Sequence, residues 1–264
     1  MGCEEAGVNQ PMPNDGLLAS QIAYYRAHAS CYDDWWSSRG RHDFGQEYRD
    51  GWNAQIETVR THLHDLGPLG EVLEFAGGTG NWTRELAIRS DSVTVLDSSP
   101  EAVAIAKGKV SGTVTWEIAD IFQFRPARRF DTVFFSFWLS HVPAERFDEF
   151  WRLVGRCLRP SGRVFFIDNA HPKLARSVRP EFFDAGRWKW DDESSVEGID
   201  AVTDLTTGIA TRLAADGRHY RLVKIWRDTE LLRRQLDDLG WSFQIATTEW
   251  AFIWGLGQER SADG

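Results

Sequence analysis

The sequence predicts an α/β fold built on a doubly wound, mostly parallel sheet with helices on both faces. Three observations carry this prediction. Short apolar strands alternate with helical segments between residues 70 and 168, a glycine-rich loop follows the first strand, and proline or glycine punctuates the boundaries. This alternation is typical of parallel βαβ units, since each parallel strand needs a crossover connection. The 264 residues allow one large domain, or a core of roughly 200 residues with an insertion.

Within residues 70–170, the expected core, apolar runs predict five strands joined by helices. The strands are expected at 71–76, 92–96, 113–118, 130–135 and 163–168. The helices are expected at 81–89, 100–109 and 144–158. Asn81 is the expected N-cap of the first helix, and Pro100 suits the first turn of the second.

The segments before the core predict a loose tail and a helical cap. Residues 1–15 are polar and contain two prolines, so they are expected to form the tail. Residues 16–66 are expected to form the cap, with an aromatic helix up to about residue 36 and an amphipathic helix over 46–66. The remainder, residues 16–264, is expected to be a single domain.

The segments after the core predict a lid and a closing unit. Residues 171–227 are expected to form a lid or substrate insertion, because 171–200 has no clear period and Asp216-Gly217 predicts a β-hairpin between strands at 208–213 and 219–226. Residues 228–258 predict a helix at 229–239 and two strands at 241–250 and 251–256. An antiparallel last strand would complete a Rossmann-like sheet.

Composition limits the classes of partner. The net charge is −9, the pI is about 5.3, and no block of Lys or Arg occurs, which argues against nucleic acid. No run approaches the ~20 apolar residues of a membrane span, and the polar start argues against lipidation or a signal peptide. The three cysteines lie far apart, which predicts neither disulfides nor a metal site and favours the cytoplasm. The 13 Trp and 16 Phe suit core packing, and their excess suggests an aromatic-walled site.

The loop after the first expected strand reads Glu74-Phe75-Ala76-Gly77-Gly78-Thr79-Gly80. A glycine loop between a strand and a helix lets the backbone approach a ligand closely. A dinucleotide site would require GxGxxG, but Thr83 occupies the position of the third glycine after Gly78 and Gly80. The NAD pattern therefore fails.

Two further acids end the next two expected strands. Asp97 lies twenty residues past Gly77, where a carboxylate can accept both hydroxyls of a ribose, although it could instead cap the helix after Ser98. Asp120 and Ile121 follow the third strand, where they would meet an adenine amino group and ring. The three acids in this order are more specific than any one of them.

With these features, residues 70–168 resemble the class I methyltransferases that use S-adenosylmethionine (SAM) and release S-adenosylhomocysteine (SAH). Their loop carries an acid and then three small residues at alternate positions, as Glu74, Ala76, Gly78 and Gly80 do here, although the family usually has glycine at position 76. The resemblance implies that Glu74 organises the loop and meets the ammonium of the cofactor's methionine part. The expected cofactor-binding residues are Tyr24, Arg26, Tyr32, Glu74, Ala76, Gly77, Gly78, Thr79, Gly80, Trp82, Asp97, Ser98, Asp120, Ile121, Ser136 and Phe137.

A narrower likeness extends over most of the chain. The motifs Tyr24-Tyr25-Arg26-Ala27, Tyr32-Asp33, His141-Val142-Pro143 and Asp216-Gly217-Arg218 are similar to those of small bacterial natural-product methyltransferases, of the kind that O-methylate phosphonates in the dehydrophos pathway. This likeness implies a small polar acceptor, held under the hairpin and the N-terminal helix by a monomer or homodimer. The expected activity is O-methylation in secondary metabolism. N- or S-methylation of a small metabolite, or SAM binding without transfer, are the alternatives.

The acceptor side has fewer signals. The fourth strand runs into Ser136-Phe137-Trp138 and lacks the Asn/Asp-Pro-Pro-aromatic motif typical of enzymes that methylate bases, which again argues against nucleic acid. His141 is the candidate general base, needed only for a protonated nucleophile, and packing or capping before Pro143 is its ordinary alternative. The expected substrate-binding residues are His28, Trp138, Arg212, Arg221 and Lys224, although the hairpin cations could simply be solvated.

Overall fold

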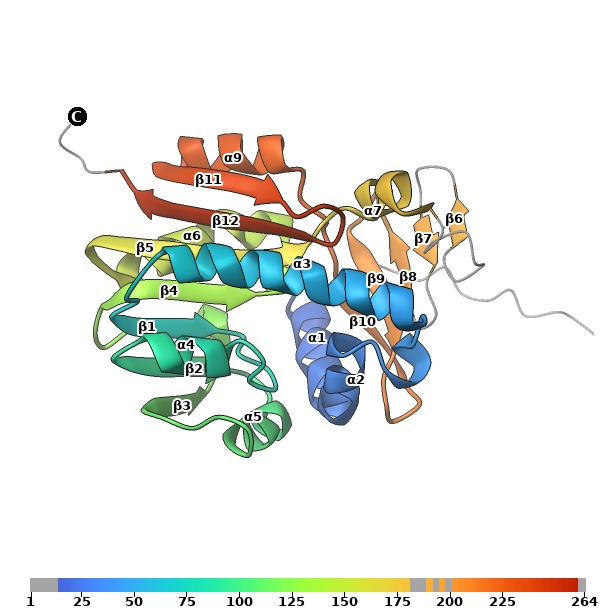
Figure 1. The fold of residues 1–264 in the computed structure, drawn as a ribbon, viewed down its shortest axis with the longest axis horizontal. Coiled ribbons are helices and arrows are strands. Elements are labelled where there is room, and N and C mark those ends of the chain that lie inside the picture. Colours follow the sequence, from blue (N-terminus) through green and yellow to red (C-terminus); the bar gives the residue numbers. More distant parts are fainter. Residues whose placement is uncertain (1–13, 181–188, 192–194, 198–200, 261–264) are drawn as a thin grey trace, which may run out of the picture.

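The computed structural model describes residues 14–180, 189–191, 195–197 and 201–260, and shows two β-sheets beside each other (Figure 1). The larger sheet has seven strands in the order β11-β12-β5-β4-β1-β2-β3. These strands are β1 (Glu71–Phe75), β2 (Ser92–Asp97), β3 (Val114–Ile118), β4 (Phe130–Ser136), β5 (Leu158–Asn169), β11 (Trp241–Thr247) and β12 (Phe252–Glu259).

The directions of the strands confirm the predicted fold class. Strands β1 to β5 pair in parallel, whereas β12 runs antiparallel to both β5 and β11. Chain order reverses beside β1, between β4 and β2, and the carboxyl ends of these strands face the crevice where ligands bind in open α/β sheets. The sheet therefore fixes where a site should lie before any side chain is considered.

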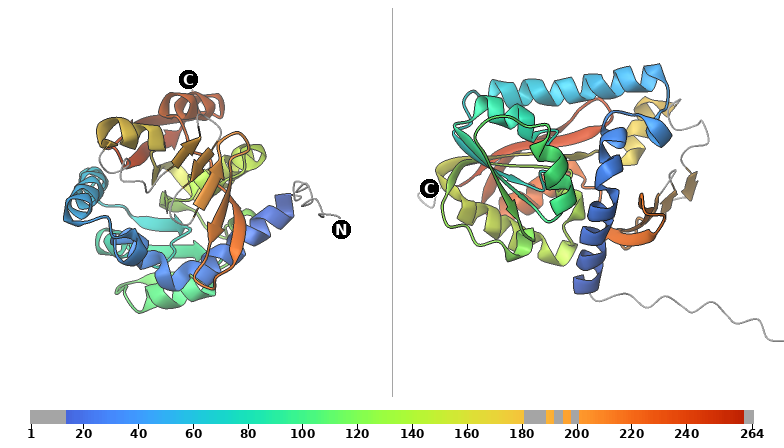
Figure 2. Two further views of the ribbon diagram at one scale, coloured as in Figure 1. Left: turned by 90° about the vertical axis from the view of Figure 1, so that its right-hand side faces the viewer. Right: turned by 90° about the horizontal axis from the view of Figure 1, so that it is seen from below.

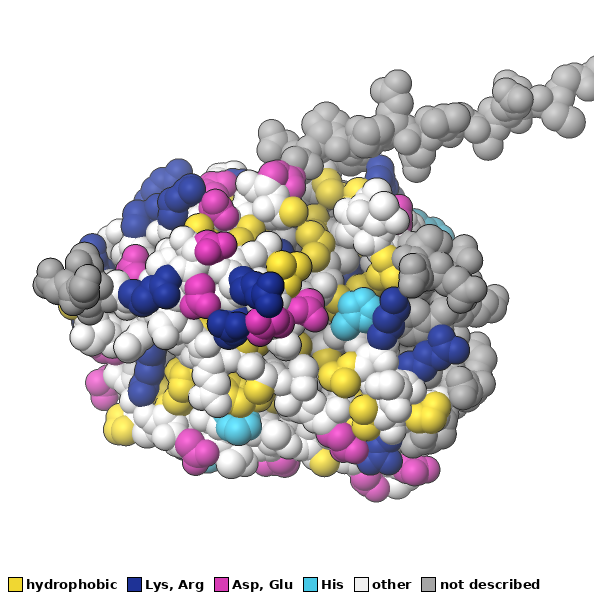
Figure 3. Space-filling model, turned by 90° about the horizontal axis from the view of Figure 1, so that it is seen from above, with side chains coloured by type: hydrophobic (Ala, Val, Ile, Leu, Met, Phe, Trp, Pro, Cys, Tyr) yellow, Lys and Arg dark blue, Asp and Glu magenta, His cyan; other side chains and the backbone are white. Residues whose placement is uncertain are grey.

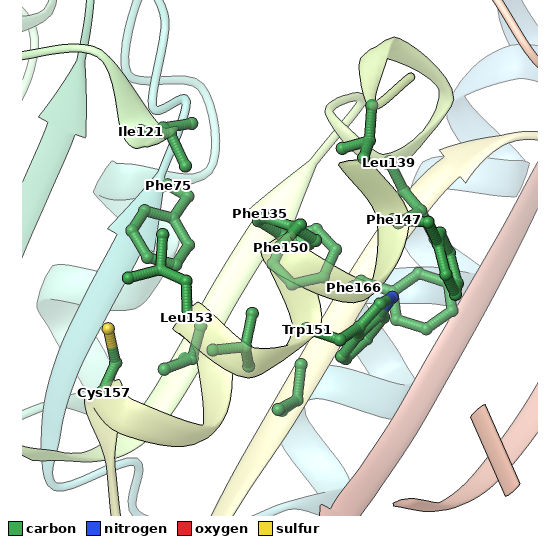
Figure 4. Close-up of a cluster of buried hydrophobic side chains, with 14 of the residues drawn as sticks. Phe75, Ile121, Phe135, Leu139, Phe147, Phe150, Trp151, Leu153, Cys157 and Phe166 are labelled. Carbon is green, nitrogen blue, oxygen red and sulfur yellow. The ribbon is translucent and has the colours of Figure 1, made fainter. Parts of the chain in front are cut away.

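Helices cover both faces of this sheet. On one face, α3 (Gln46–Asp65) and α4 (Thr83–Arg89) pack through Trp52, Val59 and Leu86. On the other, α6 (Phe147–Cys157) and α9 (Thr229–Asp238) bury a layer of aromatic and aliphatic side chains that includes Phe75, Phe135, Phe150, Trp151 and Phe166 (Figure 4). Much of the aromatic excess is thus core packing. Helix α3, expected in the cap, instead packs with α4 on the first of these faces.

The cap over the carboxyl ends of the strands consists of α1 (Asn14–His28) and α2 (Tyr32–Trp36), joined by a short 3-10 turn. Helix α1 lies between the main sheet and the second sheet, against β10 and α5 (Pro100–Lys107) (Figure 2). The expected loose tail, residues 1–15, lies almost wholly outside the described residues. The cap therefore closes the crevice at the switch point.

The predicted lid is larger than a hairpin. The expected pair, β9 (Ile209–Leu213) and β10 (His219–Val223), belongs to a five-stranded antiparallel sheet in the order β10-β9-β8-β7-β6. The additional strands are β6 (Lys189–Asp191), β7 (Ser195–Glu197) and β8 (Ala201–Asp204). Strands of three or four residues are too short to show the two-residue period, so the sequence pattern missed them.

Several local expectations were also wrong. Helix α4 begins at Thr83, and Asn81 does not cap it because the Asn81 amide binds Asp33 and Thr79. Residues 172–178, which show no clear period, form α7. Strand β5 begins at Leu158, five residues before the predicted start, and pairs with β4 from its first residue.

The described residues contain no helix with the length and apolar character that crossing a membrane requires. Within the same residues, no group of three or more His, Cys, Asp or Glu side chains is arranged to hold a metal ion. On the face seen from above, basic and acidic side chains intermingle and do not gather into a basic patch (Figure 3).

Candidate active site

A cavity lies at the carboxyl ends of β1, β2 and β4, beneath α1. The wall consists of the glycine loop, the turn after β2, the turn after β3, the segment after β4, and one face of the cap. The cavity thus occupies the place where an open α/β sheet binds its ligand.

The structure brings most of the expected cofactor residues to this wall. Those that line the cavity are Tyr32, Ala76, Gly78, Thr79, Asp97, Ser98, Asp120, Ile121, Ser136 and Phe137, together with the acceptor candidates Trp138 and His141. The expected residues that do not line it are Tyr24, Arg26, His28, Glu74, Gly77, Gly80, Trp82, Arg212, Arg221 and Lys224. Several of the residues that do not line the cavity lie behind its wall.

The glycine loop turns through left-handed backbone. Gly78 and Gly80 have φ of +55° and +83°, and Ala76 has φ of +52°, in the region that a Cβ disfavours. The glycine usual in the family would therefore relieve strain at position 76. At Gly77, a Cβ would lie 2.4 Å from Cγ1 of Val95, so the close approach of the loop to β2 requires glycine.

Asp97 and Asp120 face the cavity at the ends of their strands or turns. Asp97 is 8% exposed, and its two carboxylate oxygens accept the backbone N–H groups of Gly78 and Ser99, both at 2.8 Å. Burial raises the pKa of Asp97, whereas these backbone hydrogen bonds lower it. Asp120 accepts the N–H of Phe122 at 3.0 Å, which places Ile121 against the cavity. The helix after β2 is capped by Ser99, not by Asp97.

Glu74 lies under the glycine loop and not in the cavity. Its side chain is 1% exposed, and neither carboxyl oxygen has a hydrogen-bond partner of good geometry in the described part of the chain. Burial raises the pKa of Glu74 to about 8, while the neighbouring Thr83 hydroxyl opposes the shift. Trp82 is also buried beneath the loop, packed on Phe134. Both residues therefore support the loop from below.

The cavity wall after β4 is strained. Phe137 has φ of +53°, which is uncommon for a bulky side chain and costs of order 1–3 kcal/mol. Its ring contacts Trp35 and Trp36 of α2 edge-on, and its N–H donates to the Ile167 carbonyl at 2.8 Å. Strained backbone of this kind is concentrated at functional sites.

Tyr25, which was not among the expected site residues, meets His141 at the cavity. The Tyr25 hydroxyl lies 2.6 Å from Nε2 of His141, and Nδ1 of His141 lies 2.5 Å from the Val223 carbonyl oxygen. A carbonyl only accepts, so Nδ1 carries the proton and Nε2 accepts from Tyr25. Burial, followed by the charges of Lys224 and Arg212, lowers the pKa of His141 well below its usual value. The imidazole is therefore neutral.

The other residues expected on α1 point elsewhere. Tyr24 is 2% exposed and packs with Ala210 and Leu222 of the second sheet, and the ring of His28 stacks on it. The Arg26 guanidinium pairs with Glu101 of α5 at 2.8 Å instead of reaching the cavity. One face of α1 lines the cavity through residues at helical spacing, which are Leu18, Ile22, Tyr25 and Ala29. This spacing is the signal in the sequence that would have indicated Tyr25 instead of Tyr24.

Buried charge surrounds Asp168 behind His141. The Lys224 ammonium donates to Ser140 Oγ and Asn169 Oδ1, both at 2.9 Å, and lies 3.7 Å from Asp168. Burial lowers the pKa of Lys224 to about 8, although Asp168 opposes the shift. Arg227 is 8% exposed and donates to the Val142 carbonyl at 3.1 Å. Lys224 and Arg227 are therefore two cations buried near the one carboxylate of Asp168, behind a cavity wall that also includes Asp97 and Asp120.

The remaining hairpin candidates are less buried. Arg212 is half-buried, with its guanidinium carbon 5.9 Å from the ring centre of Tyr24. Arg221 is also half-buried, and its backbone N–H donates to Ser20 of α1 at 3.1 Å. The hairpin therefore fastens the cap by its backbone and brings positive charge near the cavity through Arg212 and Lys224.

Comparisons with known proteins agree with this geometry. A family model described as a methyltransferase domain matches residues 72–162. The structure of a DhpI–SAH complex is 32% identical, covering 93% of this chain and 98% of that chain with a TM-score of 0.68. A DhpI–SAM–HEP complex is 33% identical, covering 94% and 100% with a TM-score of 0.69. An uncharacterised methyltransferase of Anoxybacillus flavithermus is 29% identical over 148 residues, which are 55% of this chain and 68% of that protein.

Proposed function

Because the chain belongs to the class I SAM-dependent methyltransferases, we propose that it transfers the methyl group of SAM to an oxygen of a small anionic acceptor. The observation that supports this proposal is the pair of cations, Lys224 and Arg227, that are buried near the carboxylate of Asp168 behind His141. Buried charges that exceed their partners favour a ligand of the opposite sign. The likeness to phosphonate O-methyltransferases points to the same class of acceptor.

The residues that line the cavity would hold SAM in the manner of the family. Asp97 and Asp120 line the cavity and would contact the ribose and adenine, and the glycine loop would face the methionine part. Bound SAM supplies an electrophilic methyl group on a sulfonium. The protein's part is to align the acceptor oxygen behind that methyl group and to exclude water.

We assign His141 a positioning role and not that of a general base. An efficient base has a pKa near the working pH, whereas burial and the nearby cations hold the pKa of His141 well below its usual range. Its Nε2 also already accepts the Tyr25 hydroxyl. The same cations that make His141 a poor base would stabilise an acceptor that arrives deprotonated. An anionic oxygen needs no base.

A panel of acceptors tests the proposed function directly. The protein would be incubated with SAM and small phosphonates, phosphate monoesters, carboxylates, phenols or amines, and SAH release would be measured together with the methylated product. We expect turnover with one of the anionic classes. Turnover confined to amines or neutral phenols would refute the proposed acceptor class, although the family assignment would stand.

Replacing Asp97 is expected to weaken SAM binding. Asp97→Ala removes the carboxylate that holds Gly78 and faces the cavity, so we expect the dissociation constant for SAM to rise at least tenfold, a loss of ~1.4 kcal/mol or more. Isothermal titration calorimetry would measure the constant. Glu117→Ala, an exposed acid on β3, provides a control of equal charge change. An unchanged constant in Asp97→Ala would remove Asp97 from the cofactor site.

The pH profile of His141→Gln distinguishes a positioning residue from a base. Gln can still accept the Tyr25 hydroxyl, so we expect the variant to keep kcat within about fivefold, with an unaltered pH profile between pH 5 and 9. Tyr25→Phe removes the hydroxyl at the cavity and should mainly raise the KM of the acceptor. Loss of a rate-limiting ionisation in His141→Gln would show that His141 is a base after all.

A further inference from the structure

The Tyr32-Asp33 motif contributes one residue to the cavity and one to the glycine loop. Tyr32 lines the cavity, but Asp33, the next residue of α2, does not. The Asp33 carboxylate instead accepts the Thr79 hydroxyl at 2.7 Å and the Asn81 amide at 3.2 Å through the same oxygen. Its other oxygen pairs with Lys109. One side chain of the cap thus holds the C-terminal end of the glycine loop that faces the cavity.

Thr79 makes this contact sensitive to the cofactor. Its side chain is 1% exposed and lines the cavity, so a bound cofactor would lie against the residue that holds Asp33. The cap covers the cavity from the other side through Leu18, Gln21, Ile22, Tyr25 and Ala29. A cofactor in the cavity therefore lies between two surfaces that Asp33 ties together.

We propose that Asp33 is a positioning residue that fastens the cap to the glycine loop and thereby slows exchange of SAM and SAH. The partly buried Thr79–Asp33 bond is the strong part of this fastening, because Thr79 itself is 1% exposed and hydrogen bonds to a charged acceptor contribute more than exposed ion pairs do. The Lys109–Asp33 pair and the Arg26–Glu101 pair of the cap are both partly exposed and contribute less. The fastening is thus local to the loop.

Dissociation kinetics test this proposal. The protein loaded with SAH would be chased with excess SAM, and release would be followed by tryptophan fluorescence or with labelled SAH. We expect Asp33→Ala and Thr79→Val each to accelerate release about tenfold. Thr79→Ser keeps the hydroxyl and should restore the slow rate. The double variant should release no faster than either single variant, because both substitutions break the same contact.

Glu101→Gln is the matched control, since it loosens the cap at α5 without touching the glycine loop, and its release rate should stay within twofold of the wild type. Thermal unfolding of each variant separates a folding defect from a release defect. The proposal is overturned if Thr79→Val releases SAH at the wild-type rate, or if the effects of Asp33→Ala and Thr79→Val on the release rate are additive in the double variant. Absence of SAH binding in the wild type would instead count against the cofactor site itself.

Discussion

Lys224→Met is expected to raise the KM for an anionic acceptor roughly 10- to 100-fold while leaving the dissociation constant of SAM within about threefold. The ammonium is 3% exposed, contacts Ser140 beside His141, and does not line the cavity, so its effect on the acceptor is that of a buried charge close to the site. Steady-state kinetics with the acceptor and calorimetry with SAM would separate the two effects.

The Lys224 prediction includes a pH dependence. Because the pKa of Lys224 is about 8, its positive charge is lost as pH rises through that value, so kcat/KM for an anionic acceptor should fall above about pH 8. The charged or titratable groups around it are Asp168 of β5, Arg212 of β9 and the neutral His141. In Lys224→Met, kcat/KM for the anionic acceptor should no longer fall above about pH 8.

Arg218→Gln is the control for Lys224→Met, because it removes one exposed positive charge from the hairpin tip and should leave the KM unchanged. Stability must be measured as well. Removal of Lys224 takes away the ammonium 3.7 Å from the buried carboxylate of Asp168 and leaves Arg227 as the other buried cation near it, which is expected to cost about 3 kcal/mol of unfolding free energy. A Lys224→Met protein that is folded, binds SAM normally and keeps the wild-type KM would contradict the proposed acceptor class.

The placement of the cofactor candidates at the cavity wall was predictable from sequence because this wall follows the chain locally. The cofactor candidates from Asp97 to Phe137 lie at the end of a strand or shortly beyond it, and parallel strands bring their carboxyl ends to one edge of the sheet. Asp97, Asp120 and Ser136 therefore reach the cavity wherever the strands form. Their order along the chain is sufficient to place them.

The acceptor half depends on contacts between segments that are far apart in sequence. Tyr25 reaches His141 across 116 residues, and Gln21 donates to the His141 carbonyl at 3.3 Å. Which face of α1 points inward is set by packing against β10, and an error of one residue turns a helix by about 100°. Because of this rotation, Tyr24 packs on the second sheet whereas the next residue, Tyr25, lines the cavity.

The lid was only partly predictable for a different reason. The Asp216-Gly217 turn fixed β9 and β10, because such turns carry a local signal. Strands β6, β7 and β8 owe their pairing to neighbours in the sheet and have no such signal. The burial of Lys224 likewise arises from β5 and the turn after β4, not from the alternation along β10.

Glu74→Gln is expected to stabilise the cofactor-free protein at pH 8 and to weaken SAM binding. The usual glutamate pKa is 4.5, and that of Glu74 is about 8, so between these values the folded protein holds a proton that the unfolded chain has lost. The free energy of unfolding of the wild type therefore falls as pH rises through this interval, by roughly 3–5 kcal/mol in total. Glutamine stays neutral and avoids that loss. Denaturant unfolding at pH 4.5 and pH 8 would measure it.

The control is Glu71→Gln, the same substitution at the start of the same strand. Glu71 pairs with Arg159 and Arg128, and the hydrogen bond from Arg159 leads the effects that lower its pKa, so its ionised form stabilises the fold and Glu71→Gln should lose stability at pH 8. The two glutamates lie three residues apart on one strand. If Glu74→Gln raises the free energy of unfolding at pH 8 and Glu71→Gln lowers it, then burial under the glycine loop, and not the position in the strand, determines the raised pKa of Glu74. A destabilising carboxyl kept under a binding loop is expected where function outweighs stability. If Glu74→Gln bound SAM as tightly as the wild type, Glu74 would have no role in cofactor binding.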